Sequence, residues 1–390
     1  MRRPKTERLP EVAQDPLSSS RIRELKAGEI IHIPTRLKMD EARLFEIISS
    51  GRLICVGETH DNLSAHRVQL AIIKGLNERF PGKIALGMEM FRKPVQEVLD
   101  QWTAGELTEI EFLKRSQWHD NWGIDFGYYR EILAYAQEHR IDVVALNPAR
   151  EIQNQVRLSG LEGLPEAVRK SLPEIDVTDP YHRALLQAVY GAHSKGSGNF
   201  ESFYRVQVLW EETMAENVVQ YLQSPRGQGK KFVVLAGAGH IHYGFGIPKR
   251  VLRRMALPYY LILPHEVSIP TAEEGQGMEY ESPDIPLLPA DFFWMVTYDR
   301  LKSDPVRLGV QVSDSEGTVK VVEVSPGSPA EQAGVKAGDT ILMLDGQKIA
   351  ESHDLVHYLG RKNFGDTATL TLQRGGAEIR AEVTFTKPSL

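Results

Sequence analysis

The chain alternates short apolar runs with longer stretches in which apolar residues recur at helical spacing. The first run covers residues 53–56, ends at Gly57, and is followed by a helical pattern over residues 64–80. An apolar run that stops at a glycine indicates a buried strand and a tight turn, because glycine accepts backbone angles that other residues rarely adopt. Glu58 and His60 follow at once. Both are candidate site residues, since ligands of parallel sheets bind just past the carboxyl ends of the strands.

Four later apolar runs are each followed closely by a polar side chain: residues 84–88 by Glu89, 141–146 by Asn147, 232–236 by His240 and 259–263 by His265. Strands that alternate with helical segments predict a parallel sheet, because each parallel crossover needs a dozen or more residues. The carboxyl ends of such strands meet at one edge. We therefore expect one cluster there, made of Glu58, His60, Glu89, Asn147, His240 and His265.

The stretch between Asn147 and Phe232 is longer than a crossover requires and carries several helical patterns. Connections of this length often cover a functional site. We expect a helical cap over the carboxyl edge of the sheet. The cap also carries aromatic and imidazole side chains, a kind that surface helices often hold without any role in a site: Tyr181, His182, His193 and Tyr204.

Composition narrows the class of protein. A chain of 390 residues with 42% apolar residues predicts two or three globular domains, and no apolar run approaches the roughly 20 residues of a membrane helix. The formal charge of −6 and the lack of a basic face argue against nucleic acid as a partner. The single cysteine, Cys55, excludes an internal disulfide, and its place within an apolar strand predicts a buried, inert thiol.

The first residues bear on location. Residues 1–5 are basic, but residues 6–20 lack the 7–15 apolar residues of a signal peptide. The expectation is therefore a cytoplasmic protein, or a periplasmic or membrane-attached one if a leader is missing from this sequence. Polarity, prolines and apolar spacing predict an amino-terminal arm over residues 1–39, an α/β domain over 40–298 and a second domain over 305–387.

The second domain carries three motifs in order, which are Ser325-Pro-Gly-Ser-Pro-Ala, Ala333-Gly-Val-x-x-Gly-Asp339 and Asp345-Gly346. In this order they resemble a PDZ domain, a small β-barrel-like sandwich with two helices. The resemblance implies that the carboxyl-terminal peptide of another protein binds as an added strand, with its carboxylate held by loop amides. The corresponding positions are Arg307, Leu308, Gly309 and Val310 in the carboxylate loop, and Leu355 and Val356 on the helix beside the groove.

The first domain's candidates Glu58, His60, Glu89 and His240 admit three kinds of chemistry. Imidazoles and carboxylates from separate strands suit Zn, Mn, Co or Fe, with His60, His240 and Glu89 as ligands and a bound water for hydrolysis. Without a metal, an imidazole oriented by a carboxylate acts as a general base. Alternatively the cap supplies a Tyr or His ligand for haem or iron.

Nucleotide binding and serine hydrolysis fit the sequence less well. The segment Gly237-x-Gly239 would need a third glycine where His242 stands. A serine between glycines, Ser197, follows no apolar strand, so a nucleophile elbow is not indicated.

The motifs of the first domain resemble the ChaN family over about residues 40–298. The resemblance rests on Gly57-Glu-Thr-His-Asp61, His66, Gln69, Glu89-Met-Phe91, Trp118, Trp122, Tyr128, Asn147-Pro148, residues 207–215 and Ala238-Gly-His240. It implies a haem- or iron-binding protein related to Tiki peptidases and erythromycin esterases, in which Glu58, His60, Glu89 and His240 form the shared core. With one cysteine, any haem is bound non-covalently. We expect haem or iron binding first and metal-dependent peptide or ester hydrolysis as the alternative. A homodimer is compatible with either.

Overall fold

The computed structural model describes residues 25–193, 199–267, 285–301, 306–315 and 317–386. The chain divides into two compact units, residues 1–107 with 115–301, and residues 108–114 with 302–390. Each unit is described by itself.

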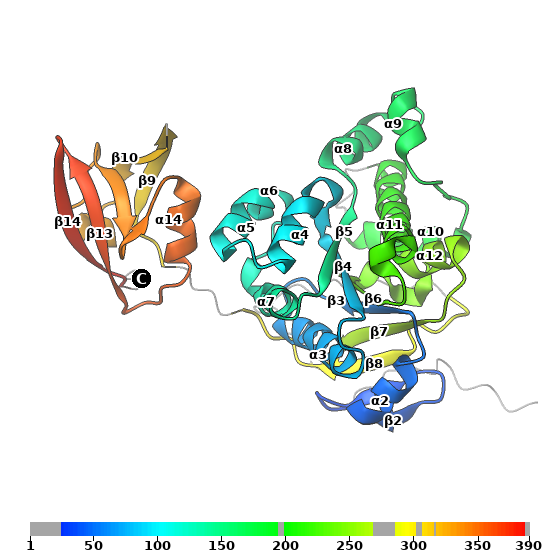
Figure 1. The fold of residues 1–390 in the computed structure, drawn as a ribbon. Coiled ribbons are helices and arrows are strands. Elements are labelled where there is room, and N and C mark those ends of the chain that lie inside the picture. The colour runs from blue at the N-terminus through cyan, green and yellow to red at the C-terminus, as the bar shows by residue number, and fades with distance from the viewer. Residues whose placement is uncertain (1–24, 194–198, 268–284, 302–305, 316, 387–390) are drawn as a thin grey trace, which may run out of the picture. The chain divides into compact units, whose positions relative to one another are not determined.

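The first unit is an α/β structure built on one eight-stranded sheet (Figure 1). Its strands are β1 (Ile30–His32), β2 (Leu37–Met39), β3 (Leu53–Glu58), β4 (Ile84–Arg92), β5 (Asp142–Asn147), β6 (Lys231–Gly237), β7 (Tyr259–Glu266) and β8 (Phe292–Val296). Their order in the sheet is β2-β1-β8-β7-β3-β6-β4-β5. From β8 to β5 all neighbours are parallel, whereas β1 is antiparallel to both β8 and β2. The predicted mainly parallel sheet is confirmed.

Helices connect these strands. They are α2 (Glu41–Ile48), α3 (Leu63–Arg79), α4 (Gln96–Thr103), α6 (Trp118–Asn121), α7 (Arg130–Glu138), α8 (Arg150–Ser159), α9 (Glu166–Ser171), α10 (Pro180–His193), α11 (Phe200–Gln223) and α12 (Ile247–Arg254). Helix α5 (Glu109–Arg115) lies between α4 and α6 in the chain, but its residues 109–114 belong to the second unit. Single 3₁₀ turns are η1 (Lys93–Val95), η2 (Phe126–Tyr128), η3 (Pro225–Gly227), η4 (Ala238–His240) and η5 (His242–Gly244). Helices α8 to α11 form the expected insert between β5 and β6. Of these, α11 packs against β5, α8 and α12.

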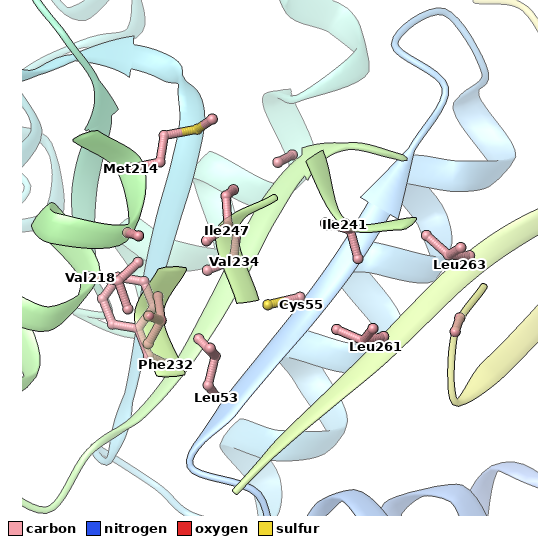
Figure 2. Packing of buried hydrophobic residues seen from close by; sticks show 14 of the residues in the cluster. Leu53, Cys55, Met214, Val218, Phe232, Val234, Ile241, Ile247, Leu261 and Leu263 are labelled. Carbon is pink, nitrogen blue, oxygen red and sulfur yellow. The ribbon is translucent and has the colours of Figure 1, made fainter. Parts of the chain in front are cut away.

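Strand β3 lies at the centre of the hydrophobic core, and every one of its residues is buried. Leu53 and Cys55 face a cluster shared with α11 and α12, which Figure 2 shows from close by. Helix α3 also packs against β3. Because alternate strand residues point to opposite faces, a strand covered on both sides is apolar throughout, as residues 53–56 are. Cys55 is buried as predicted, and burial raises the pKa of its thiol.

Two local features differ from the sequence-based interpretation. Gly57 lies within β3, so it is not the turn residue, and the interpretation as a turn is wrong. A Cβ atom there would lie 2.5 Å from Leu263 Cδ2 and 3.3 Å from the Cα atom of Ala238, so glycine lets these neighbours pack closely against β3. In addition, residues 30–39, assigned to the amino-terminal arm, form β1 and β2. These strands have three residues each, too few to show an alternating pattern.

The second unit is an antiparallel sheet with two short helices, as the PDZ resemblance implied. Its elements are β9 (Val310–Ser315), β10 (Thr318–Val324), α13 (Pro329–Gln332), β11 (Thr340–Leu344), β12 (Gln347–Lys348), α14 (Ser352–Leu359), β13 (Thr367–Arg374) and β14 (Ala377–Thr384). The strand order is β14-β13-β11-β10-β9, with β12 paired to β11, so β9 is an edge strand. Its own core holds residues from Val306 to Phe385.

Candidate functional site

The structure brings Glu58, His60, Glu89 and His240 together at the carboxyl ends of neighbouring strands. Glu58 is the last residue of β3 and is paired in register with Gly237, the last residue of β6. Glu89 lies in β4 on the other side of β6, and His240 closes the 3₁₀ turn that follows β6. The parallel arrangement therefore explains the convergence, because strand ends of one polarity share one edge.

Glu58 is buried and holds two imidazoles. Its Oε1 lies 2.6 Å from His60 Nδ1, and its Oε2 lies 2.9 Å from His66 Nδ1. The Tyr129 hydroxyl donates to Oε1 over 3.0 Å. Burial alone would raise the pKa of Glu58, but the charges of His66 and His60 and their hydrogen bonds lower it to about 2. Glu58 is therefore ionised over the whole ordinary pH range.

Glu89 is held by the chain that follows β6. The backbone N–H of Gly237 donates to Glu89 Oε2 over 2.7 Å, and His240 Nε2 lies 3.5 Å from Oε1. The pKa of Glu89 is lowered, since the neighbouring His240 and His60 outweigh the effect of burial. Asn147, at the end of β5, supports the same place, because its amide donates to the backbone carbonyl of Glu89 over 2.5 Å.

His60 reaches the Glu89 side of the cluster. A Cβ atom added to Gly237 would lie 3.3 Å from His60 Nε2 and 3.6 Å from Glu89 Oε2. A side chain at position 237 would therefore fill the space between His60 and Glu89, and glycine leaves it open. The His60 side chain is 39% exposed, so solvent reaches the cluster there. Burial opposes protonation of His60, yet the Glu58 carboxylate raises its pKa.

His240 is buried and is held from the opposite side by helix α11. Its Nδ1 lies 3.1 Å from Glu211 Oε1. The other oxygen of Glu211 lies 3.3 Å from both His182 Nε2 and Arg250 Nη1. Although burial lowers the pKa of His240, Glu89 and Glu211 together raise it to about 10.

Several of these groups were not singled out from the sequence. Tyr129 and Arg250 were missed, while His66, and Glu211 within residues 207–215, entered only as parts of motifs. The available signal for Glu211 was a pair of adjacent acids, Glu211 and Glu212, among the mostly apolar buried residues of α11. Carboxylates are rarely buried unless they are paired, so such a position indicates a partner elsewhere in the chain.

His265, expected at the same edge, does not join the cluster. It lies in β7, and its ring stacks on Phe293 with centroids 4.6 Å apart. Burial lowers the pKa of His265. The pKa of the nearby His242 is lowered by burial and, to a smaller extent, by His265. The expectation placed His265 correctly at a strand end, but its side chain packs toward β8.

The described part of the cap presents one of its candidate ligands to solvent. Tyr181 is 47% exposed, whereas His182 and Tyr204 are buried. The Tyr204 hydroxyl donates to the Val177 carbonyl over 2.9 Å, which occupies it. The side chain of His193 and the segment 194–198 lie outside the described residues.

Within the described ranges, no group of three or more His, Cys, Asp or Glu side chains is arranged to coordinate a metal ion. The spacing of two of the predicted ligands nevertheless suits a metal. Two ligands of a tetrahedral ion at about 2.0–2.2 Å lie roughly 3.4 Å apart. His240 Nε2 and Glu89 Oε1 are 3.5 Å apart.

In the second unit the residues of the predicted peptide groove differ in exposure. Strand β9 pairs on one side with β10, and Ser352 at the start of α14 is tied to it, with its N–H and hydroxyl donating to Asp314 over 2.9 and 2.7 Å. Val356 on α14 is 59% exposed, but Leu355 belongs to the core. Leu308 is also buried, while Arg307 is exposed.

Comparison with protein families finds two matches. The family described as "Haem-binding uptake, Tiki superfamily, ChaN" matches residues 44–251. The PDZ domain family matches residues 306–385. Among solved structures, the chain is similar to a protein described as "Cofacial heme binding to ChaN of Campylobacter jejuni", with 15% identity, 69% of this chain and 96% of that chain covered, and a TM-score of 0.53. At this identity the likeness concerns the fold.

Curated relatives match a much shorter part. A probable periplasmic serine endoprotease DegP-like of Marinomonas sp. (strain MWYL1) is 35% identical over 108 residues, which is 23% of each chain. Serine protease HTRA1 of Xenopus tropicalis is 39% identical over 64 residues, 16% of this chain and 14% of that protein. The chain thus spans less than a quarter of these relatives. Among the described residues, no helix has the length and apolar character needed to cross a membrane.

Proposed function

Because the chain belongs to the ChaN family of the Tiki superfamily, described as haem-binding uptake proteins, we propose that its first unit binds haem non-covalently through Tyr181. The observation that carries this proposal is the exposure of Tyr181, whose ring stacks on the buried ring of Phe245. Tyrosinate is one of the side chains that hold haem iron in proteins, and when bound, haem supplies a redox-active iron.

The aromatic surface around Tyr181 suits the face of a porphyrin. The Tyr181 ring stacks on Phe245 with centroids 6.3 Å apart and an angle of 10° between the planes. The Tyr243 ring stacks on Phe245 in turn, at 5.7 Å and 26°. Phe245 is buried, so the stack is backed by protein. A planar apolar ligand would cover the exposed part of these rings and remove apolar area from water.

A cation lies on the same surface. The Lys249 ammonium pairs with Asp179, and the other oxygen of Asp179 accepts from the backbone N–H of Tyr181 over 3.0 Å. The Lys249 side chain is half exposed. It is therefore available to a haem propionate beside Tyr181, and the apolar rings, the phenol and the ammonium together fit the group.

Haemin titration of the full chain tests this site. We expect a saturable Soret shift for the wild type and loss of at least ten-fold in affinity for Tyr181→Phe, because the substitution removes only the ligand oxygen. Tyr260→Phe is the matched control, since Tyr260 lies at the amino end of β7, where its hydroxyl contacts Ser50. Equal haemin affinity of Tyr181→Phe and Tyr260→Phe would overturn the assignment of Tyr181.

A second candidate function is hydrolysis of a peptide or ester with a divalent metal, and one specific observation favours it. Both Gly-x-x-His imidazoles hold a buried carboxylate at Nδ1, which leaves Nε2 of each on the side of Glu89. A carboxylate behind an imidazole is the usual second shell of a metal ligand. His60, His240 and Glu89 would hold the ion, which would supply an activated water.

Metal titration separates the two candidates. With Mn²⁺, Co²⁺ or Zn²⁺ and the full chain, we expect saturable binding that His60→Ala and His240→Ala each abolish. His265→Ala is the control, because His265 lies at the same sheet edge but outside the cluster. Metal affinity unchanged in His60→Ala and His240→Ala, alongside a haemin response, would leave haem binding as the function of this unit.

For the PDZ domain we propose binding of hydrophobic carboxyl-terminal peptides, carried by the edge strand β9 beside α14. Val356→Lys should weaken binding about ten-fold or more in a peptide array, because it places a charge beside the groove. Val322→Lys is a matched control, since Val322 on β10 is 53% exposed and Val356 is 59% exposed. Amidated peptides should not bind. Binding of amidated and free peptides alike would contradict the proposal.

A further inference from the structure

The buried carboxylate of Glu211 stands directly behind His240. Glu211 lies in α11, 29 residues before His240 in the sequence, and its Oε1 is 3.1 Å from His240 Nδ1. Its Oε2 is 3.3 Å from His182 Nε2 and from Arg250 Nη1. The carboxylate thus contacts three cationic or imidazole side chains at once, so rotating it away from His240 would also disturb its contacts with Arg250 and His182.

The first Gly-x-x-His motif has the same arrangement. Glu58 Oε1 is 2.6 Å from His60 Nδ1, and Oε2 is 2.9 Å from His66 Nδ1. Each motif histidine is thus backed by a buried carboxylate, and each carboxylate is backed by a second, buried imidazole. The two series are His66–Glu58–His60 and His182–Glu211–His240, and they come from unrelated parts of the chain.

The two series converge on Glu89. His240 Nε2 lies 3.5 Å from Glu89 Oε1, and the open space at Gly237 lies between His60 Nε2 and Glu89 Oε2. A carboxylate that accepts from Nδ1–H fixes the orientation of an imidazole and directs its Nε2 to the opposite side, where it can bind a metal once it carries no proton. For His60 that carboxylate lies in the same motif, whereas for His240 the motif has none.

We propose that Glu211 is a positioning residue that holds His240 with Nε2 directed at Glu89, so that helix α11 completes the site at the sheet edge. The inference rests on the second candidate function, the hydrolytic or metal site, and deepens it. Under this proposal the insert supplies a necessary part of the site, in addition to covering it. A purely structural role would instead make Glu211 one more partner of the buried arginine.

The adjacent Glu212 provides a matched control. It is equally buried and pairs with Arg253 and Arg254 at 2.9 and 2.8 Å, and with Arg250 Nε at 3.2 Å. None of these three contacts involves His240. Glu211→Gln and Glu212→Gln therefore remove the same charge, one residue apart, from one buried network.

The first measurement is the ¹⁵N chemical shift of the His240 ring in the full chain labelled at histidine. Glu211→Gln should shift the Nδ1 resonance of His240, because the acceptor of its hydrogen bond changes, and Glu212→Gln should not. The second is titration with Co²⁺ alone, where Glu211→Gln should lose about 10–100-fold in affinity. The Co²⁺ affinity of Glu212→Gln should stay within about three-fold of the wild-type value.

Equal effects of Glu211→Gln and Glu212→Gln on both measurements would overturn the proposal. If Glu211→Gln does not fold, Glu211→Asp decides, because it keeps the charge but withdraws the carboxylate from His240. Wild-type ring shifts and Co²⁺ affinity in Glu211→Asp would then refute it. If the wild-type chain binds no Co²⁺, the second candidate function fails, while the ring shifts still show whether Glu211 positions His240.

Discussion

Glu58 Oε2 and His66 Nδ1 lie 2.9 Å apart, and both side chains are buried. His66 Nε2 lies 3.1 Å from the backbone carbonyl of His60, so one imidazole links the carboxylate to the turn that follows β3. Since α3 carries His66, this pair joins the first helix after the turn to the last residue of the strand before it. The turn bearing His60 is thereby held at both ends.

A double-mutant cycle should reveal this coupling. Glu58→Gln and His66→Gln should each lower the free energy of unfolding by about 3 kcal/mol or more, because each leaves a buried partner uncompensated. The double variant should lose less than the sum, by roughly 0.5–3 kcal/mol. Urea unfolding followed by tryptophan fluorescence measures all three. Strict additivity would show that the two residues act independently.

Packing of α2 on α3 depends on Gly75. A Cβ atom there would lie 2.1 Å from Phe45 Cζ, so alanine would clash with the ring. Gly75→Ala should destabilise the chain by about 1–3 kcal/mol despite the better helix propensity of alanine. In a Phe45→Ala background the same change should stabilise by about 1 kcal/mol, because only the propensity remains. The same sign in both backgrounds, measured by urea unfolding, would contradict this packing.

The carboxylate loop of the PDZ domain requires glycine for a structural reason. Gly309 has φ of +80°, and a Cβ atom there would lie 2.2 Å from Ser328 Cβ. Gly327 has φ of +72° with nothing within 4 Å of such an atom. Gly327→Ala should cost about 1–2 kcal/mol for the left-handed backbone, and Gly309→Ala clearly more.

Hydrogen exchange of β11 and β13 measures this difference, since all five tryptophans lie in the first unit. Equal protection in the two glycine variants would mean that Ser328 moves aside without cost.

The strain at Gly309 also affects how peptide binding should be tested. Loss of binding on replacing Gly309 would reflect disruption of the loop itself, so Val356 is the better probe.

Stability should fall in mild acid because of His242. Burial, with a smaller effect of His265, lowers its pKa from 6.5 to about 4. The unfolded chain therefore binds the proton first, and the contribution of His242 is complete above pH 6.5 and lost as the pH falls toward 4. When the pH is lowered from 7 to 4.5, the free energy of unfolding of His242→Gln should fall by about 2 kcal/mol less than that of the wild type.

His139→Gln is the control for this pH series, because His139 is exposed. Its unfolding free energy should follow the wild type at both pH values. If His242→Gln instead shows the same acid loss as the wild type in urea unfolding, His242 is protonated in the folded chain and the burial argument fails.

Much of the fold follows from local pattern. The apolar runs predicted strands β3 to β7, and helical spacing predicted α2, α3 and α11, because burial on one or both faces imposes a period on the sequence. The short strands β1 and β2 were not foreseen, since three residues show no period. Gly57 was recognised as necessary but for the wrong reason, because close packing against Leu263 involves a strand about 200 residues away.

The sequence by itself placed Glu58, His60, Glu89 and His240 at one sheet edge, because strands of one polarity share that edge, but it left open which carboxylate holds which imidazole. Only the tertiary structure decided that Glu211 stands behind His240, that His265 turns away toward Phe293, and that Tyr181 is the exposed tyrosine of the cap. The physical reason is that periodicity encodes which face of an element is buried. Which side chain it meets there depends on how distant elements pack.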